Sequence, residues 1–284
     1  MHKKHPAFLQ FNSPWYFDPG EVRFPSPPEG LDVEEVARRL SSGELTQPFI
    51  FENASERRLH FTRDNVQSVM SLEEPDALIV AYTRKMMSFL LFNPKPQHMV
   101  MVGLGGGSLP KFCYRYLRKT QITVVEIDAA VIALRDEFCV PPDDHRFHIV
   151  HDDGAHYIST LTDPIDVVLV DAFDPIGIAP SLADSHFYAH VASQLSPDGV
   201  LVMNLSGEYS RFADHIERIQ AAFGGSALLV PVEEDDNLLL FAFKKKKLIT
   251  ASGVYKSRAR QLKRAFSLEF PRFLNRICLG ENLA

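Results

Sequence analysis

Residues 98–108 read His98-Met-Val-Met-Val-Gly103-Leu-Gly-Gly-Gly-Ser108, and this stretch decides the fold. An apolar segment passes into a glycine-rich turn, and a stripe of apolar residues at helical spacing follows between positions 109 and 117. The pattern predicts a buried strand, a tight turn and a helix that begins near Ser108. Glycines let the backbone approach a ligand closely, and the N–H groups at a helix start favour a polar or anionic group. On its own, the motif fits an ordinary strand-to-helix turn equally well.

Strands and helices alternate after this unit, and the strands are almost continuously apolar. Such strands are typical of a parallel sheet that is covered on both faces. Two apolar runs near the end of the chain are joined by the short acidic stretch 233–237, which permits only an antiparallel hairpin. We therefore predict an α/β, Rossmann-like, doubly wound and mostly parallel sheet with an antiparallel edge hairpin, by analogy with class I methyltransferase-like folds. The strands are expected at 98–102, 122–125, 147–150, 165–170, 200–205, 227–232 and 238–243, and the helices at 129–138 and 184–195.

The segment before the glycine-rich turn has a different pattern. Three short runs with partial alternation, at 48–52, 58–62 and 67–72, predict a small antiparallel meander. Residues 1–45 are rich in proline and glycine, so we expect a weakly structured lead-in with one short helix at 33–40. Apolar spacing in residues 78–92 predicts a further helix that ends before the next proline.

Composition limits the class of protein. The chain has 284 residues, 45% hydrophobic and 23% charged, which is close to the average for a soluble globular protein. No apolar run approaches the roughly 18 residues of a membrane span, and the N-terminal residues have no signal-peptide core. Three scattered cysteines are too few for a disulfide framework or a cysteine-rich metal site. We expect a cytoplasmic protein without membrane contact.

Charge divides the chain unevenly. Residues 244–284 contain eleven basic and two acidic residues, so this tail carries +9, whereas the net charge of the whole chain is −6. The tail lacks a nucleic-acid motif, and we predict an amphipathic helix that packs against the acidic body or a second subunit. Contact with RNA or a membrane is the alternative. The expected parts are an N-terminal extension with a small β domain (1–75), a nucleoside-binding catalytic domain (76–243) and a basic helical tail (244–284).

Acidic residues follow the predicted strands in order, where ligands bind in open α/β sheets. Glu126 lies 23 residues after Gly103, the spacing expected of a carboxylate that accepts the ribose hydroxyls of a nucleotide. Each acidic group also fits a helix cap or a solvated turn, and for Asp128 we expect a cap. The candidate nucleoside-binding residues are Gly103, Gly105, Gly106, Glu126, Asp153 and Gly154.

The acidic rim favours one class of nucleoside. Ser108 occupies the position of the third glycine of a dinucleotide fingerprint, and no basic residue stands beside the loop to pair with a pyrophosphate. A neutral nucleoside that carries a cationic sulfonium suits the rim better. We therefore predict S-adenosylmethionine or its decarboxylated form as co-substrate. We predict no metal, because His145, His148 and His151 recur every three residues and cannot share one face of a strand.

A family resemblance rests on several segments together. They are 103–107 (Gly-Leu-Gly-Gly-Gly), 125–128 (Val-Glu-Ile-Asp), 153–155 (Asp-Gly-Ala), 168–179 (Val-Leu-Val-Asp-Ala-Phe-Asp-Pro-Ile-Gly-Ile-Ala) and 195–201 (Leu-Ser-Pro-Asp-Gly-Val-Leu). Over roughly residues 47–243 the chain resembles the spermidine synthase (polyamine aminopropyltransferase) family. The resemblance implies that Glu126 binds the ribose, that Asp153 and Gly154 meet the adenine, and that Asp171 and Asp174 face the reaction centre. It also implies a homodimer and an N-terminal β-meander.

The acceptor side departs from the family pattern. The resemblance assigns Gln67 to the substrate side, but the family's Tyr-x-Glu has no counterpart in the helix at 78–92. Tyr82 lies on the apolar face of that helix and is our candidate to line the cavity. Arg84 or Lys85 could pair with a carboxylate on the acceptor, although an exposed turn of the helix explains them as well. We expect an amine acceptor other than plain putrescine.

Three functions remain open from the sequence. The first is transfer of an aminopropyl group from the sulfonium to an amine, with Asp171 taking the proton and Asp174 orienting the amine. The second is methyl transfer to a small molecule, which is favoured by Gly106, because it replaces the aspartate that the family carries in its first loop. The third is a nucleoside-binding protein that has lost its chemistry. Retention of both aspartates argues against the third.

Overall fold

A computed structural model describes residues 8–15, 18–25, 30–174, 177–205, 212–235, 237–245, 253–279 and 281–283. For 173–174, 177–178, 212–214 and 281–283 it describes the backbone alone. The chain forms two compact units. Unit 1 comprises Met1–Ile79, Gly105–Phe112 and Asp128–Pro141, and unit 2 comprises Val80–Leu104, Cys113–Ile127 and Pro142–Ala284.

Unit 1 contains an antiparallel sheet whose five strands lie in chain order. The last three strands confirm the predicted meander. The prediction of a weakly structured lead-in is wrong, because residues 9–12 and 21–24 form two further strands and the helix at 33–40 extends to Ser42. The elements are β1 (Leu9–Asn12), β2 (Glu21–Phe24), α1 (Val33–Ser42), β3 (Phe49–Glu52), β4 (Glu56–Thr62), β5 (Asn65–Ser71) and α4 (Ala129–Ala133).

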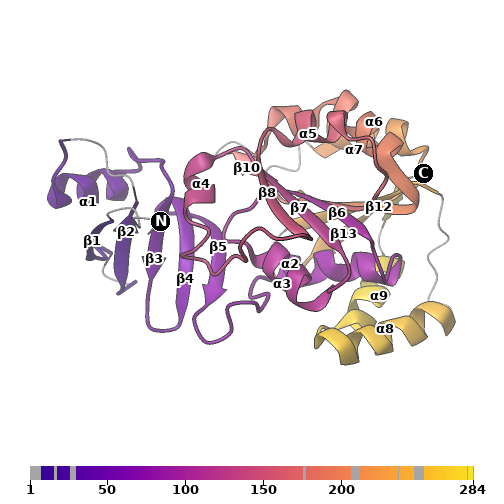
Figure 1. Cartoon of the computed structure of the whole chain (residues 1–284), viewed down its shortest axis with the longest axis horizontal. Coiled ribbons are helices and arrows are strands. Elements are labelled where there is room, and N and C mark those ends of the chain that lie inside the picture. The colour runs from indigo at the N-terminus through magenta and orange to yellow at the C-terminus, as the bar shows by residue number, and fades with distance from the viewer. Residues whose placement is uncertain are drawn as a thin grey trace. The chain divides into compact units, whose positions relative to one another are not determined.

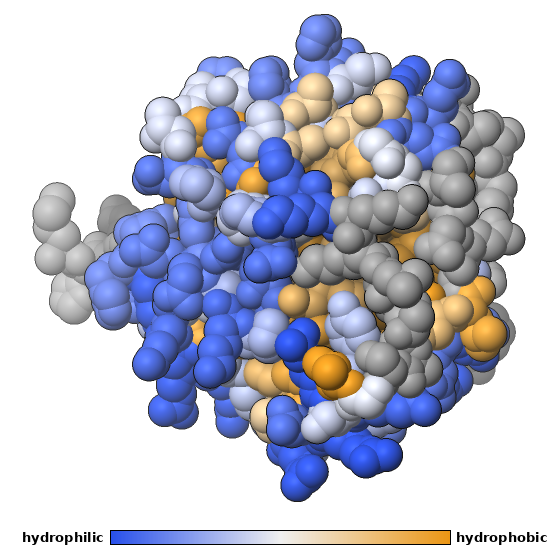
Figure 2. All heavy atoms as spheres, turned by 90° about the vertical axis from the view of Figure 1, so that its right-hand side faces the viewer, coloured by the Kyte–Doolittle hydropathy of each residue, from blue (hydrophilic) through white to orange (hydrophobic). Residues whose placement is uncertain are grey.

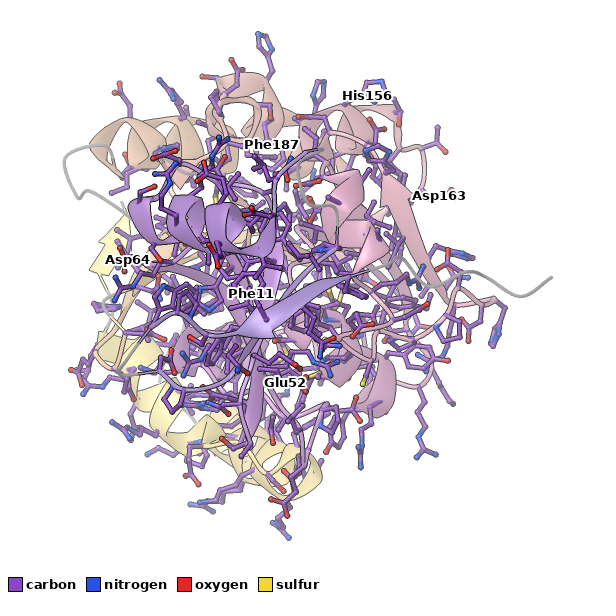
Figure 3. The ribbon with its side chains drawn as sticks, turned by 90° about the vertical axis from the view of Figure 1, so that its left-hand side faces the viewer. Phe11, Glu52, Asp64, His156, Asp163 and Phe187 are labelled. Carbon is purple, nitrogen blue, oxygen red and sulfur yellow. The ribbon has the colours of Figure 1, made fainter. Side chains whose placement is uncertain are left out.

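Burial explains why the lead-in is structured. Val22 and Phe24 on β2 are fully buried with Trp15, Phe49 and Phe51 in one apolar cluster. Two four-residue strands show too little alternation to be recognised, but their pairing with β3 buries these side chains, and this tertiary burial outweighs the local proline and glycine signal. At the sheet surface the carboxylate of Glu52, labelled in Figure 3, pairs with two arginines of neighbouring strands, Arg23 and Arg57.

Unit 2 contains an eight-stranded sheet in the order β15-β13-β14-β12-β9-β6-β7-β8. The strands from β12 to β8 are parallel, and β14, β13 and β15 continue the sheet with antiparallel pairing. The predicted fold class is confirmed, with β15 as an additional edge strand. The strands are β6 (His98–Val102), β7 (Gln121–Glu126), β8 (Phe147–His151), β9 (Ile165–Val170), β12 (Leu195–Leu205), β13 (Ala227–Val232), β14 (Asn237–Phe243) and β15 (Glu281–Leu283).

Helices cover both faces of this sheet (Figure 1). Helices α5, α6 and α7 lie on one face, and α2, α8 and α9 lie on the other. Helix α3 begins in unit 1 and ends in unit 2. The helices are α2 (Ala81–Met86), the 3-10 helix η1 (Met87–Leu91), α3 (Ser108–Tyr116), α5 (Gly154–Thr160), the 3-10 helix η2 (Pro180–Ala183), α6 (Ser185–Gln194), α7 (Phe212–Phe223), α8 (Gly253–Phe266) and α9 (Phe270–Leu279).

Three helices differ from the sequence prediction. The helix expected at 78–92 is shorter and continues as η1, and the helix expected at 129–138 ends at Ala133. The single helix predicted for the basic tail is two helices, which are separated at Ser267, where φ is +56°. Helix α9 buries apolar residues, including Phe270 and Phe273, whereas α8 exposes most of its cations. Hydrophilic side chains cover much of the unit 2 face drawn in Figure 2.

The strand order identifies where a ligand binds in such a sheet. From β6 the chain proceeds to β7 and β8 on one side, and then returns to β9 and β12 on the other side. The carboxyl ends of β6 and β9 therefore flank a topological switch point, the usual ligand site of open α/β sheets. Gly103 follows β6, and Asp171 follows β9.

Candidate active site

Gly103 allows the two strand ends at the switch point to approach closely. Its φ is +97°, and a Cβ atom at this position would lie 2.2 Å from the carbonyl oxygen of Asp171. The Asp171 N–H in turn donates to the carbonyl of Val102 at 2.9 Å. Any larger residue at position 103 would push the ends of β6 and β9 apart. This glycine therefore keeps the Asp171 backbone close to the end of β6, at the switch point.

Glu126 ends β7 and contacts the glycine-rich turn. Its Oε2 accepts a hydrogen bond from the Leu104 N–H at 2.8 Å, and the residue is 9% exposed. The carboxylate is thus held beside the first turn, where the ribose of a bound nucleoside lies in this class of fold. Its assignment to the ribose remains a prediction.

Asp153 combines two local roles. Its Oδ1 caps α5 by accepting from the N–H groups of Ala155 and His156, and its Oδ2 accepts from the Ser181 hydroxyl at 2.8 Å. Gly154 is the first residue of α5 and is buried. The capping role was an open alternative from the sequence, and the contact with adenine stays a prediction for both residues. Asp128 caps α4 through the Ala130 N–H, as expected.

Asp171 is the centre of a small hydrogen-bond network. Its Oδ2 accepts from the Tyr82 hydroxyl at 3.0 Å, and its Oδ1 accepts from Asn204 Nδ2 at 3.1 Å. Burial raises the pKa of Asp171 above the usual range, although both hydrogen bonds oppose the shift. Burial and the nearby Asp171 charge raise the pKa of Tyr82 well above its ordinary value, so its hydroxyl stays a donor. A carboxylate with a raised pKa at a strand end is suited to accept a proton.

Asp174, the second predicted catalytic residue, lies in the two-residue strand β10 (Phe173–Asp174), which pairs with β11 (Gly177–Ile178). Its side chain is outside the part of the structure that is described. Its predicted role in orienting the amine therefore stays a prediction.

Sequence reasoning missed Asn204 and Asp235. Asn204 lies in β12 and is 3% exposed, and its amide is the second partner of Asp171. A polar residue in the apolar run 200–205 is a signal that could have found it. Asp235 lies in the turn between β13 and β14, and its Oδ2 accepts from the Tyr82 N–H at 2.8 Å. The acidic turn was visible in the sequence, but only as a connection.

The cations of α2 have different environments. Lys85 is buried and donates to the carboxylate of Glu234, so its ammonium is engaged within the protein rather than held for an acceptor. Arg84 is half-buried on the same helix. Its pairing with a carboxylate of the acceptor stays a prediction.

Three predicted residues belong to unit 1. Gln67 donates to the Asn65 side chain at 2.7 Å, and Gly105 has a φ of +50°. A Cβ atom on Gly106 would lie 2.8 Å from Ser68 Oγ and 2.9 Å from Phe138 Cδ1. Phe138 and Ser68 thus occupy the space in which the family's aspartate side chain would begin. The ligand roles of all three residues stay predictions.

The acidic turn is also the partner of the basic tail. Arg276 on α9 lies 2.5 Å from Glu233, and Arg272 lies 3.5 Å from Glu234. These contacts agree with the expectation that the tail packs against the acidic body. Within the described residues, no group of three or more His, Cys, Asp or Glu residues could hold a metal ion. No helix in the described ranges is long and apolar enough to cross a membrane.

The sheet order and the glycine-rich turn at its switch point define a class I methyltransferase-like fold, and comparisons identify the family. Residues 79–221 match the family described as spermine/spermidine synthase domain. The chain is 36% identical over 229 residues to the polyamine aminopropyltransferase of Chromobacterium violaceum, covering 80% of this chain and 88% of that protein. It is 37% identical over 227 residues to that of Neisseria meningitidis serogroup B, covering 79% and 86%. The chain belongs to the spermine/spermidine synthase family.

Solved structures support the fold. Spermidine synthase from Thermotoga maritima superposes with a TM-score of 0.61 at 20% identity, over 81% of this chain and 80% of that chain. A spermidine synthase in complex with the transition-state analogue AdoDATO superposes with a TM-score of 0.59 at 19% identity, over 81% and 79%. At such identities the likeness shows the fold alone.

Proposed function

We propose that this protein is an aminopropyltransferase, which moves the aminopropyl group of decarboxylated S-adenosylmethionine to an amine. The observation that carries the proposal is the Asp171 carboxylate, held at the switch point by Tyr82 and Asn204 with a raised pKa. Membership of the family supports the same reaction. The methyltransferase alternative has no comparable support from the curated relatives, which are named polyamine aminopropyltransferases.

The proposed reaction is a single displacement. The lone pair of the acceptor nitrogen attacks the propyl carbon next to the sulfonium, the C–N bond forms, and the C–S bond breaks. Its electron pair returns to sulfur, which leaves as the neutral thioether methylthioadenosine. The nitrogen loses one proton to the Asp171 carboxylate, directly or through water. Because the sulfonium is already activated, most of the rate gain comes from positioning.

The protein's own residues supply the binding surface. Glu126, beside the Leu104 N–H, is our candidate for the ribose hydroxyls, and Asp153 with Gly154 for the adenine. We further propose that the protein is a homodimer in the cytoplasm and has no nucleic-acid partner. We propose domain boundaries at residues 75 and 243, which separate a β domain, a catalytic domain and a basic tail. Measurement of the molar mass of the purified protein in solution tests the homodimer.

Identification of the released nucleoside tests the function. The purified chain is incubated with decarboxylated S-adenosylmethionine, or with the intact donor, and a panel of amines. The proposal expects methylthioadenosine with the decarboxylated donor and tighter calorimetric binding of that donor. Release of S-adenosylhomocysteine from the intact donor would instead establish methyl transfer. The Asp171→Asn variant is the control for the base, because it keeps the shape of the side chain and removes its proton-accepting charge.

A further inference from the structure

One face of helix α8 carries a row of cations. Positions 256, 260, 263 and 264 recur at helical spacing, so their side chains lie on the same side of the helix. The opposite face buries Ala259 and Leu262. The helix contains no acidic residue, and like charges four positions apart repel each other. The row therefore lowers the stability of the helix unless an anion lies close to it. The exposed side chains of the row are Lys256, Arg260, Lys263 and Arg264.

Carboxylates within the described residues neutralise little of this charge. In the row, Lys263 alone forms an ion pair among these residues, with Glu269 at 2.7 Å. Both side chains of the pair are about half exposed, so water screens their attraction. The cations of α9 differ, because Arg272 and Arg276 pair with the acidic turn. The row on α8 is therefore the positive surface of the tail that an external anion can reach.

An open pocket lies at the C-terminal end of this row. Its volume is about 550 Å³, which is within the range of small-molecule sites. The side chains that line it offer two guanidinium groups, one ammonium group and one hydroxyl, and each of these groups can donate hydrogen bonds. The pocket therefore suits a ligand with several anionic oxygen atoms. The lining residues are Arg260, Lys263, Arg264 and Ser267.

Ser267 has a backbone conformation that is unfavourable for its residue type. Its φ is +56°, and its N–H donates to the Lys263 carbonyl at 2.9 Å, where α8 ends. Glycine is favoured at such a helix end, because a side chain at positive φ is strained. The serine costs stability but supplies a hydroxyl to the pocket beside the cations. Backbone strain of this kind occurs often at ligand-binding sites.

Phosphate oxygens match these donors best. A guanidinium group binds phosphate through two parallel N–H donors, and a hydroxyl adds a further donor. One phosphate ester carries at most about two negative charges, whereas the pocket presents three cations. A membrane surface fits less well, because the apolar face of α8 is buried and cannot insert. Nucleic acid also fits less well, because the exposed positions of α8 carry no aromatic side chain on which a base could stack.

We propose that the pocket formed by Arg260, Lys263, Arg264 and Ser267 binds a polyphosphate chain, either free or as part of a nucleotide. The two guanidinium groups and the Ser267 hydroxyl donate to phosphate oxygens, and Lys263 exchanges Glu269 for a phosphate. None of the four residues belongs to the network around Asp171. The inference thus goes beyond the proposed aminopropyl transfer and does not depend on it.

Calorimetry of the purified full chain with tripolyphosphate tests the site. Arg264→Gln removes a cation of the lining, and Lys256→Gln is the matched control, because it removes one exposed charge of the same row outside the lining. Glutamine is a good helix former, so both variants keep α8.

The expected result is a loss of affinity confined to the pocket variant. Loss of charge-assisted hydrogen bonds weakens tripolyphosphate binding by about 10- to 100-fold in Arg264→Gln. The remote charge of Lys256 is screened by salt, so Lys256→Gln weakens binding less than about threefold. Equal losses in the two variants, or no binding to wild type, would overturn the site.

The Ser267→Gly variant separates binding from folding. Removal of the strained side chain raises the melting temperature, whereas loss of the hydroxyl weakens tripolyphosphate binding by about 3- to 10-fold. Damage to the helix end would instead lower both quantities. Unchanged affinity in this variant would contradict the assignment of the pocket.

Two further ligands identify the source of the phosphate chain. ATP that binds no more tightly than tripolyphosphate indicates recognition of the chain alone, and tighter ATP binding indicates a nucleotide. Only affinity that Arg264→Gln lowers is counted for this site, because the switch point can also bind a nucleoside. An RNA oligonucleotide that binds where tripolyphosphate and ATP do not would refute the proposal.

A footprint of wild type needs no variant. Phenylglyoxal modifies exposed arginines, and mass spectrometry locates the modified positions. Tripolyphosphate should protect Arg260 and Arg264 and leave the half-exposed Arg63 of unit 1 as reactive as before. Equal protection at all three positions, or none at Arg260 and Arg264, would exclude binding in the pocket.

Discussion

Lys111 is a buried cation in the helix that follows the glycine-rich turn, and its effect on the free energy of unfolding can be predicted. It lies in the first turn of α3, is 1% exposed, and donates from Nζ to the carbonyl of Phe138 at 2.8 Å. Burial lowers its pKa from 10.5 to about 8. Phe138 is the side chain that occupies the space beside Gly106, so Lys111 holds this part of unit 1 together.

The pKa determines both the sign and the size of the effect. Below pH 8 the folded and unfolded states both carry the charge, and the folded state bears the full cost of burying it. Between pH 8 and 10.5 the folded state releases the proton first, so the free energy of unfolding rises with pH. The difference between the two pKa values corresponds to about 3 kcal/mol.

The Lys111→Met variant isolates this effect. At pH 7 removal of the buried charge raises the free energy of unfolding of the variant. Loss of the donor to the Phe138 carbonyl lowers it by about 1–3 kcal/mol. The stability of the variant minus that of wild type should therefore fall by about 3 kcal/mol between pH 7 and pH 10.5. Urea unfolding of both proteins at four pH values measures this difference, because the other titrating groups cancel. Lys119→Met, at an exposed position, is the matched control for the loss of a lysine. A difference that does not change with pH for Lys111→Met would refute the reasoning.

Three further predictions concern the site in unit 2. Asp171→Asn should lower turnover by about 10²- to 10⁴-fold. At pH 8 the melting temperature of this variant should at least equal that of wild type, because the raised pKa of Asp171 means that burial of its charged form is costly. The difference in melting temperature should disappear below about pH 4, where the wild-type carboxyl is protonated in both the folded and the unfolded state. A large drop in melting temperature at pH 8 would contradict the assignment. Tyr82→Phe removes a donor that lowers the pKa of Asp171, so the acidic limb of the rate against pH should move to higher pH, and an unmoved limb would exclude Asp171 as the titrating base. Gly103→Ala places a Cβ atom 2.2 Å from the Asp171 carbonyl oxygen, at a residue whose φ is positive. Chemical unfolding should show that the free energy of unfolding falls by more than about 2 kcal/mol, and calorimetry should show that the variant no longer binds the donor.

The central sheet could be predicted because burial on both faces leaves a trace in the sequence. The strands that end at Val102, Glu126 and Val170 are nearly continuous apolar runs, and their order with the intervening helices indicates a parallel sheet. Strands β1 and β2 leave no such trace. They are short, and they become strands because pairing with β3 buries Val22 and Phe24.

The sequence alone determined which residues end the parallel strands, and hence that Gly103, Glu126 and Asp171 meet at one rim. Apolar periodicity is a local property, and the alternation of strands with helices along the chain makes the strands parallel. Only the tertiary structure decided what surrounds Asp171. Tyr82 reaches it across 89 positions, and Asp235 reaches Tyr82 across 153. Such contacts follow from how α2 packs against β12, β13 and β14, and no local pattern specifies a hydrogen bond between residues so distant in the chain.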